Sequence, residues 1–412
     1  AHVFIIHYPD EERPAARPLK TAPCYERMKE RGAVFGQKFG WERPNFFATD
    51  GMPQEDDWSF RRSRWFEAIR KEVANTTNNA GLLDMTAFAK CQVSGPGAEA
   101  FLDYFVANSL PQKVGGIGLC HALNTKGGIH SEFTIRRDAD DSFYLVSAGA
   151  LQRLDHDYLK KHMPRDGSVT FTQLTDANGV LVLAGPKARQ ILERVTDADL
   201  SNEAFRWLTA QDITVGGAPA NAMRVNYVGE LGWELHHPMD VQNQIFDALF
   251  EAGEDLGLQP FGIRAMDSMR LEKSYRMVGT ELSIEYSAYE SAMDRFIKPE
   301  KADFLGRDAL LAWQERGIDN LLVMMVVDGV DDADALGNNA LLQNGEVVGR
   351  ATGGGFGFRV DKSLALGMVK PELAEPGTEL EIEILGRNYA ATVVADSPFD
   401  PKNERLRDVN GA

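Results

Sequence analysis

Residues 227–235, Tyr-Val-Gly-Glu-Leu-Gly-Trp-Glu-Leu, combine two glycines, two aromatic residues and two carboxylates at the end of a run of alternating apolar residues. Glycines within such an alternating pattern are typical of a sharp bend between strands. We therefore predict a strand that bends here and returns as a second strand. A bend of this kind can direct a side chain into a cavity.

The two carboxylates of this stretch have different predicted fates. Glu234 alternates with Trp233 and Leu235, and a carboxylate held among apolar neighbours is costly unless hydrogen-bond donors meet it. A ligand can supply such donors, and the aromatic framing favours a functional role for Glu234. For Glu230 we expect an ordinary β-turn with a solvated carboxylate.

Two segments of the chain repeat one signature. A strand-like run ending at Val93 is followed by Ser94-Gly95-Pro96-Gly97 and then by apolar residues at helical spacing up to Phe105. The same order returns in residues 180–195, with Gly185-Pro186 at its centre. Proline suits the first turn of a helix. We predict an internal pseudo-repeat, in which two related halves face each other across a cavity.

A predicted hairpin lies between the two copies. Residues 123–128, Leu-Asn-Thr-Lys-Gly-Gly, have the composition of a tight turn. The following strand, 129–137, alternates, with apolar residues on one face and His130, Glu132 and Thr134 on the other. Glu132 is therefore expected to project from a rigid element.

Residues 261–273, Phe-Gly-Ile-Arg-Ala-Met-Asp-Ser-Met-Arg-Leu-Glu-Lys, indicate a helix with Met266, Met269 and Leu271 towards the core. Arg270 lies on this helix. The usual fate of a helix arginine is a pair with a neighbouring carboxylate, but its fork of donors can equally hold the carboxylate of a ligand. The residues alone leave both roles open.

From about residue 318 onwards the chain consists of short β runs separated by glycine turns, which predicts a small, mostly antiparallel barrel. Residues 353–355 are three consecutive glycines within this part. They lack the spacing, the lysine and the following helix of a phosphate-binding loop, so we expect a packing or turn role.

The composition excludes several classes of protein. The 412 residues, 43% hydrophobic and 25% charged, suffice for two or three domains with their own cores. A net charge of −17 argues against nucleic acid or an anionic membrane as the main partner. Three cysteines without CxxC spacing indicate neither a disulfide framework nor a zinc site. No apolar run reaches the length of a membrane helix, so we expect a protein of the cytoplasm, or of the mitochondrial matrix in a eukaryote.

Motifs of other chemistries are not apparent. No Ser/His/Asp order, HExxH motif or metal-like His/Cys cluster stands out, and no metal is predicted. His236 and His237 would point to opposite faces of a strand, which disfavours a chelating pair.

Residues 32–47, Gly-Ala-Val-Phe-Gly-Gln-Lys-Phe-Gly-Trp-Glu-Arg-Pro-Asn-Phe-Phe, form an aromatic- and proline-rich connector that must pack on something. With the 227–235 stretch and the Arg270-Leu271-Glu272 helix, this segment resembles the glycine-cleavage T-protein (aminomethyltransferase) superfamily. The resemblance is greatest to the carboxy-terminal, folate-binding half of the FAD-dependent dimethylglycine and sarcosine dehydrogenases and oxidases. The GxGxxG fingerprint of a flavin dinucleotide site is absent from this sequence.

The resemblance implies roles for five residues. Glu234 matches the carboxylate that accepts the amino group and the adjacent ring N–H of the folate head group, and Tyr227 and Trp233 are placed in the same pocket. Arg270 is favoured as a holder of the ligand carboxylate. Glu132 matches a carboxylate beside the reactive nitrogens of tetrahydrofolate, where it orients the nucleophile and stabilises an iminium cation. The T-proteins have Asp-Asp where this chain has Ser131-Glu132.

The fold class expected from these observations is α+β, a pseudo-repeated aminomethyltransferase-like folate-binding domain followed by a small antiparallel β-barrel. The expected boundaries are 1–62 for the junction with a flavin domain, 63–316 for the folate-binding domain and 317–405 for the barrel.

The expected activity is one-carbon transfer, in which the imine or formaldehyde from N-demethylation is captured on tetrahydrofolate as 5,10-methylenetetrahydrofolate. FAD would belong only to a missing amino-terminal domain or to a partner. Two alternatives stay open: a stand-alone tetrahydrofolate-dependent S- or O-demethylase, and a folate-binding regulatory module without turnover.

Overall fold

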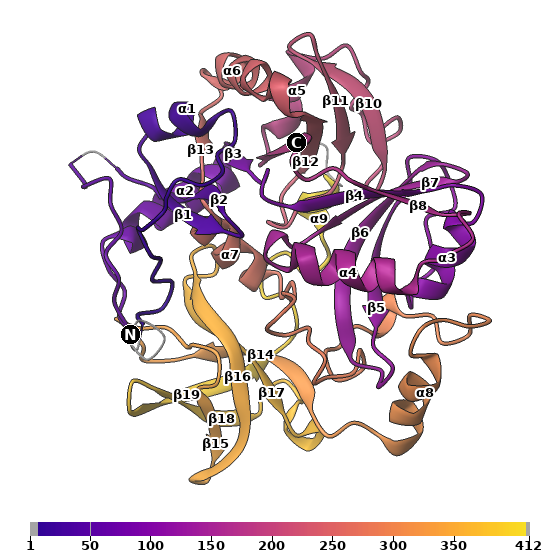
Figure 1. The fold of residues 1–412 in the computed structure, drawn as a ribbon. Coiled ribbons are helices and arrows are strands. Elements are labelled where there is room, and N and C mark those ends of the chain that lie inside the picture. Colours follow the sequence, from indigo (N-terminus) through magenta and orange to yellow (C-terminus); the bar gives the residue numbers. More distant parts are fainter. Residues whose placement is uncertain (1–6, 50, 409–412) are drawn as a thin grey trace.

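The structure is a computed structural model that describes residues 7–49 and 51–408. The described residues form two large sheets, a small two-stranded sheet and a closed barrel, and helix α7 (Ile263–Glu272) lies near the centre of the view, next to the barrel (Figure 1). None of the helices in the described ranges has the length and apolar character needed to cross a bilayer.

The first half of the pseudo-repeat is a five-stranded sheet with the strand order β5-β6-β7-β4-β8. Its helices α3 (Ala98–Phe105) and α4 (Gln152–His162) pack against the apolar face. The strands are β4 (Ala89–Ser94), β5 (Ile117–Leu123), β6 (Ile129–Ala139), β7 (Ser142–Ser147) and β8 (Thr170–Gln173). The predicted hairpin at 123–128 is the antiparallel β5–β6 connection.

The second half is a six-stranded sheet with the order β10-β11-β12-β9-β3-β13. Helices α5 (Ala188–Glu193) and α6 (Gln242–Gly253) contribute to its core. The strands are β3 (Ala80–Asp84), β9 (Asn178–Ala184), β10 (Ala210–Val215), β11 (Ala218–Met223), β12 (Gly232–Pro238) and β13 (Leu258–Pro260). The predicted bend is the segment 224–231, because β11 precedes it and the antiparallel β12 follows it.

The repeated Gly-Pro signature has one structural cause in both halves. Gly95 follows β4 with φ +113°, and Gly185 follows β9 with φ +127°. A Cβ at these positions would lie 2.5 Å from the carbonyl oxygen of Ser168 and 2.6 Å from that of Asn79, respectively. Only glycine combines this backbone conformation with such a close approach. Each strand can therefore turn directly into its helix, and the predicted pseudo-repeat is present.

The amino-terminal segment packs against the second half. Its elements are α1 (Tyr25–Glu30), β1 (Ala33–Lys38) and β2 (Trp41–Phe47), followed by α2 (Trp65–Asn78). The buried Glu72 of α2 accepts backbone N–H groups of Phe47 at 2.6 Å and of Gly262 at 2.8 Å. These two bonds fasten β2 to the beginning of α7.

The carboxy-terminal part is a closed barrel with the order β14-β17-β16-β15-β18-β19, as predicted. Its strands are β14 (Leu321–Val327), β15 (Ala340–Gln343), β16 (Glu346–Gly357), β17 (Lys362–Val369), β18 (Glu379–Ile384) and β19 (Arg387–Val394). Helix α8 (Arg307–Arg316) precedes the barrel and α9 (Glu404–Arg407) follows it. The three glycines 353–355 lie within β16, so their role is packing.

The expectation of a solvated Glu230 is wrong. Its side chain is 1% exposed, and it accepts hydrogen bonds from Arg359 Nη1 at 3.0 Å and Arg405 Nε at 2.8 Å. Arg359 belongs to the connection between β16 and β17, and Arg405 belongs to α9. Both partners are more than 100 residues away in sequence, so local turn chemistry gives no sign of them.

Glu230→Ala tests this buried ion pair. Removal of one member of a buried pair costs about 3–5 kcal/mol, because the other charge stays buried. Arg359 keeps Glu272 as a partner, so we expect a loss of about 3 kcal/mol in urea unfolding. The matched control is Glu383→Ala, at an exposed position on β18, which should change stability by less than about 0.5 kcal/mol. Equal effects of the two substitutions would contradict the role of Glu230.

Candidate functional site

Glu234 is a buried carboxylate in the middle of the six-stranded sheet. It lies on β12 opposite Met223 of β11 and Val182 of β9, and it is 7% exposed. Burial raises the pKa of Glu234 to about 8. Within the described part of the chain, its side chain has one hydrogen-bond partner, His236 Nε2, at 3.2 Å from Oε2. The other oxygen, Oε1, is available to accept hydrogen bonds from a ligand.

His236 supports Glu234 and connects the two halves of the pseudo-repeat. It lies two residues after Glu234, so both side chains occupy the same face of β12. Its Nδ1 is 3.1 Å from the hydroxyl of Tyr144, which belongs to β7 in the other sheet. Burial lowers the pKa of His236 well below its ordinary value, so the ring is neutral at pH 7. The second histidine, His237, points to the opposite face and bonds the carbonyl of Pro238.

Glu132 is the second candidate carboxylate. It lies on β6 directly opposite His121 of β5, and its Oε2 is 2.9 Å from His121 Nε2. The Glu132 side chain is 20% exposed, whereas that of His121 is fully buried. The strand alternates as predicted, with Ile129, Ser131 and Phe133 buried between partly exposed residues.

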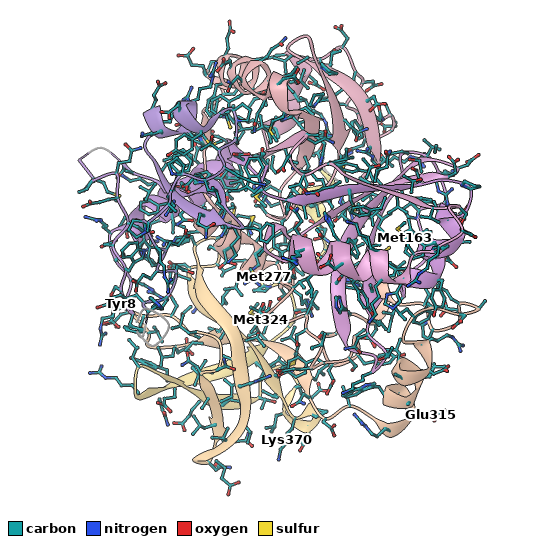
Figure 2. All side chains as sticks on the ribbon, viewed as in Figure 1. Tyr8, Met163, Met277, Glu315, Met324 and Lys370 are labelled. Carbon is teal, nitrogen blue, oxygen red and sulfur yellow. The ribbon has the colours of Figure 1, made fainter. Side chains whose placement is uncertain are left out.

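Tyr227 lies on the bend between β11 and β12 and contacts Tyr275 and Arg276. Burial raises the pKa of Tyr227, the charge of Arg270 opposes this rise, and the charge of Glu132 adds to it. The Tyr227 hydroxyl donates to the carbonyl of Arg276, and the Tyr227 ring is 5.6 Å from that of Tyr275. Met277, the next residue after Arg276, is labelled near the centre of Figure 2, between the two sheets and the barrel.

Arg270 has the carboxylate partners that a helix arginine usually finds. Its Nε donates to Asp267 at 2.7 Å, and its Nη1 contacts Glu281 at 3.3 Å and the carbonyl of Tyr275 at 3.0 Å. No bond of Nη2 is recorded among the described residues. A role of Arg270 in holding a ligand carboxylate therefore stays a prediction, and it rests on the Nη2 donor group.

Trp233 lies on the opposite face of β12 from Glu234. It is fully buried in the core of the second half, and its ring is 6.0 Å from that of Phe205. Successive residues of a strand point to opposite faces, so β12 directs Trp233 away from the face that carries Glu234. The structure therefore gives Trp233 a packing position.

Sequence reasoning missed three supporting residues. His121 and His236 contact the two carboxylates, and Tyr144 contacts His236. The sequence contains a signal for two of these residues, His236 and His121. His236 has period-2 spacing from Glu234, and the β5–β6 turn sets the register that places His121 opposite Glu132. The partnership of Tyr144 left none, because it joins two sheets whose packing is not encoded in either strand.

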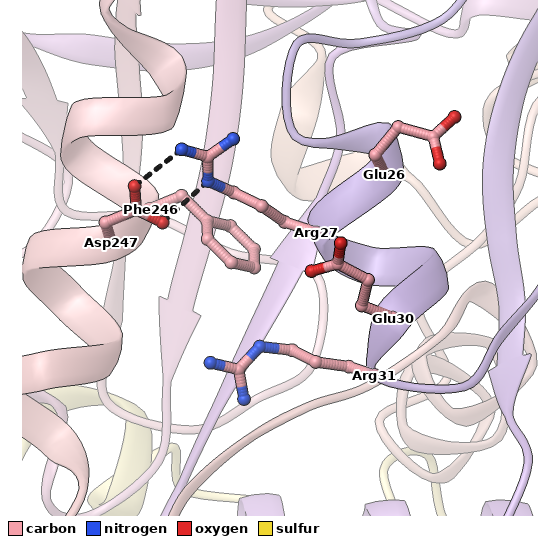
Figure 3. A pocket seen from close by; sticks show the side chains of 6 residues that line it. All are labelled: Glu26, Arg27, Glu30, Arg31, Phe246 and Asp247. Atoms are coloured by element: carbon pink, nitrogen blue, oxygen red, sulfur yellow. Dashed lines mark hydrogen bonds and ion pairs between the residues drawn. The ribbon is translucent and has the colours of Figure 1, made fainter.

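Neither of two cavities in the structure is lined by a candidate carboxylate. Figure 3 shows a cavity of about 520 Å³ between α1 and α6, where Arg27 forms a two-point ion pair with Asp247 at 2.7 Å. A second cavity of about 370 Å³ lies between the two sheets and is lined partly by Arg136, Tyr144 and His236. The second cavity is thus lined by His236 and Tyr144, which support Glu234, but the Glu234 carboxylate does not line it.

Comparison with known proteins identifies the class. Residues 24–301 match the GCVT N-terminal domain, and residues 321–400 match the glycine cleavage T-protein C-terminal barrel domain. The aminomethyltransferase T of the glycine cleavage system from Bartonella henselae has a similar structure, with a TM-score of 0.79 and 26% identity, over 93% of this chain and 99% of that one. The chain belongs to the glycine cleavage T-protein family. The predicted resemblance and fold class are confirmed.

The relatives fall into two groups: some are about twice as long as this chain, and others have about its length. Human dimethylglycine dehydrogenase, named as mitochondrial, is 34% identical over 99% of this chain and 47% of that protein. The aminomethyltransferase of Natranaerobius thermophilus is 30% identical over 93% of this chain and 98% of that protein. A mouse pyruvate dehydrogenase phosphatase regulatory subunit is 27% identical over 94% of this chain and 47% of that protein. The chain thus spans about half the length of the dehydrogenase relatives, and it is an aminomethyltransferase-like module related to them.

Glu234→Gln tests the burial of the carboxylate. Between about pH 4.5 and 8 the folded wild type binds one more proton at this site than the unfolded chain does. The wild type therefore loses up to about 1.4 kcal/mol of stability per pH unit as the pH rises through this window. The variant does not lose this stability. Its melting temperature minus that of the wild type, measured by calorimetry, should therefore increase from pH 5 to pH 8. Below pH 4.5 this difference should be constant. The exposed control Glu383→Gln should follow the wild type. A pH-independent difference for Glu234→Gln would contradict the raised pKa.

Proposed function

We propose that this chain is the tetrahydrofolate-dependent one-carbon transfer module of a dimethylglycine- or sarcosine-dehydrogenase-like enzyme. In this proposal it captures the imine or formaldehyde from N-demethylation as 5,10-methylenetetrahydrofolate. The observation that carries the proposal is the buried Glu234, which has one histidine partner and a free oxygen on the face opposite Trp233. The family membership supports the same reading.

Glu234 fits the head group of a folate. A pterin presents an amino group and an adjacent ring N–H, which one carboxylate can accept side by side. The acceptor must then be ionised, whereas burial keeps the free Glu234 mostly protonated at pH 7. Binding at this site therefore releases a proton. His236 Nε2 can then donate to the carboxylate and stabilise its charge.

Glu132 and Tyr227 lie on the reacting side of the proposed site. Tetrahydrofolate supplies the amine nitrogens that take up the one-carbon unit. The partly exposed Glu132 carboxylate can orient such a nitrogen and stabilise positive charge that develops beside it. Tyr227, whose hydroxyl donates to the carbonyl of Arg276, is assigned to one side of the same pocket. The remaining donor edge of Arg270 is assigned to the carboxylate tail of the ligand.

A flavin domain or subunit is the proposed partner, and FAD is assigned to it and not to this chain. Among the described residues, twelve large hydrophobic side chains are exposed, and five of them lie within residues 8–60. Two of the five, Tyr8 and Phe60, have rings 5.2 Å apart. The adjacent, exposed rings of Tyr8 and Phe60 are assigned to the contact with this partner, and the dehydrogenase relatives are about twice the length of this chain.

The compartment is proposed with the function. The human dimethylglycine and sarcosine dehydrogenases are named as mitochondrial, which supports the mitochondrial matrix if the source is eukaryotic and the cytoplasm otherwise. The three cysteines are buried and unpaired.

A regulatory module without turnover is the second candidate. It is favoured by one observation, the similarity to the mouse phosphatase regulatory subunit over 94% of this chain. The two candidates share the fold, so only a measurement of transfer separates them.

Tetrahydrofolate should raise the melting temperature of the wild type at pH 7, because a ligand that binds only the folded state stabilises it. The gain is about 2.7 kcal/mol at a hundredfold excess over Kd. Glu234→Gln should lose most of this shift, because the amide N–H₂ of glutamine would face an N–H donor of the pterin. The control Glu383→Gln should keep the shift. Calorimetric titration in two buffers of different ionisation enthalpy should show proton release for the wild type. No shift at saturating ligand would refute the proposal.

Glu132→Gln should keep the thermal shift and slow the transfer step, by roughly a hundredfold if the carboxylate acts as a base. The measurement is the rate of 5,10-methylenetetrahydrofolate formation above the uncatalysed rate, followed by mass spectrometry. Binding without transfer in the wild type would instead support the regulatory module. Formation of 5-methyltetrahydrofolate from a methylated sulfonium or methoxy donor would identify the S- or O-demethylase.

A further inference from the structure

His121 is a buried histidine whose presence the packing of β5 does not explain. Its neighbours Cys120, Ala122 and Leu123 are fully buried and apolar, and His121 is equally buried. Its Nδ1 has no hydrogen-bond partner among the described residues. A buried polar atom without a partner costs about 1–3 kcal/mol, so an apolar residue would be the more stable choice for packing alone.

Within residues 7–49 and 51–408, the His121 side chain has one hydrogen bond, to Glu132, at 2.9 Å between Nε2 and Oε2. The two residues are directly opposite in the β5–β6 register, so the backbone of both strands fixes their approach. An ionised carboxylate can only accept hydrogen bonds. With Glu132 as the acceptor, Nε2 carries the proton, and in the neutral tautomer that provides this donor Nδ1 is the bare ring nitrogen.

Both halves of the pseudo-repeat thus present a carboxylate supported by a buried imidazole. In the second half, His236 is itself held by Tyr144, across the boundary between the sheets. In the first half, His121 has no such anchor among the residues that the structure describes, and its ring makes an edge contact with that of Phe296, 6.1 Å away between centroids. Strand register and packing therefore set the orientation of the His121 ring. The hydrogen bond from this ring in turn restricts the orientation of the Glu132 side chain.

We propose that His121 is a positioning residue, whose Nε2–H holds the Glu132 carboxylate in the one rotamer that faces the reacting nitrogen of the folate. This inference rests on the proposed function and adds a residue to it. Without the donor, the Glu132 side chain is free to leave this orientation, since it is partly exposed. A misplacement of about 1 Å in a reacting group can cost a factor of roughly 100 in rate.

The test compares His121→Phe, which keeps the ring and removes the donor, with His121→Gln, whose amide keeps a donor. His121→Phe should lower kcat for transfer by roughly tenfold to a hundredfold, with KM for tetrahydrofolate and the folate-induced thermal shift unchanged. His121→Gln should recover most of the rate. In the double variant His121→Phe/Glu132→Gln, kcat should equal that of Glu132→Gln, because His121 acts through Glu132.

A second readout is independent of activity. In the ¹⁵N NMR spectrum of the whole chain, His121 should show a protonated Nε2 and a bare Nδ1, and Glu132→Gln should shift the Nε2 resonance. A proton on Nδ1 with a bare Nε2 would overturn the inference, whether or not the wild type transfers one-carbon units. Wild-type kcat for His121→Phe, or losses that add in the double variant, would also overturn it. Absence of transfer in the wild type with the Nε2–H tautomer present would refute the proposed function and leave the His121–Glu132 contact established.

Discussion

The arrangement of this molecule depends on one buried guanidinium. Arg359, from the connection between β16 and β17, forms ion pairs with Glu230 and Glu272 and donates to the carbonyls of Val228 and Met269. These contacts join the barrel to the bend 224–231 and to helix α7. A buried arginine cannot give up its charge, so both carboxylates and both carbonyls must stay in place around it. The bend that carries Tyr227 and leads into β12 is thereby held by the barrel.

The second constraint is the contact between the two halves. Tyr144 of the first sheet and His236 of the second are hydrogen-bonded, and His236 in turn contacts Glu234. Each half contributes one carboxylate to the proposed site, Glu132 from β6 and Glu234 from β12. The hydrogen bond between Tyr144 and His236 brings the two halves together beside Glu234. The site therefore depends on how two sheets pack, and one sheet alone would not form it.

Much of this could be predicted from the sequence. The Gly-Pro signatures indicated the pseudo-repeat because glycine is required where Gly95 and Gly185 adopt positive φ against a nearby carbonyl. Alternation placed Glu132 and Glu234 on defined faces of their strands. Alternation also predicts that Trp233, the residue next to Glu234, points to the opposite face of the strand and into the core. The Glu230 prediction was wrong because both of its arginine partners lie beyond residue 350.

By itself, the sequence determined the strands, the turns, the barrel and the identity of the two candidate carboxylates, because these follow from local periodicity and from residues with restricted backbone conformations. Only the tertiary structure decided which polar groups meet. It buried Glu230 between two arginines, brought Glu281 to Arg270, and joined Tyr144 to His236 across the two sheets. The physical reason is that burial and hydrogen bonding are set by neighbours from distant parts of the chain, which periodicity along one segment does not encode.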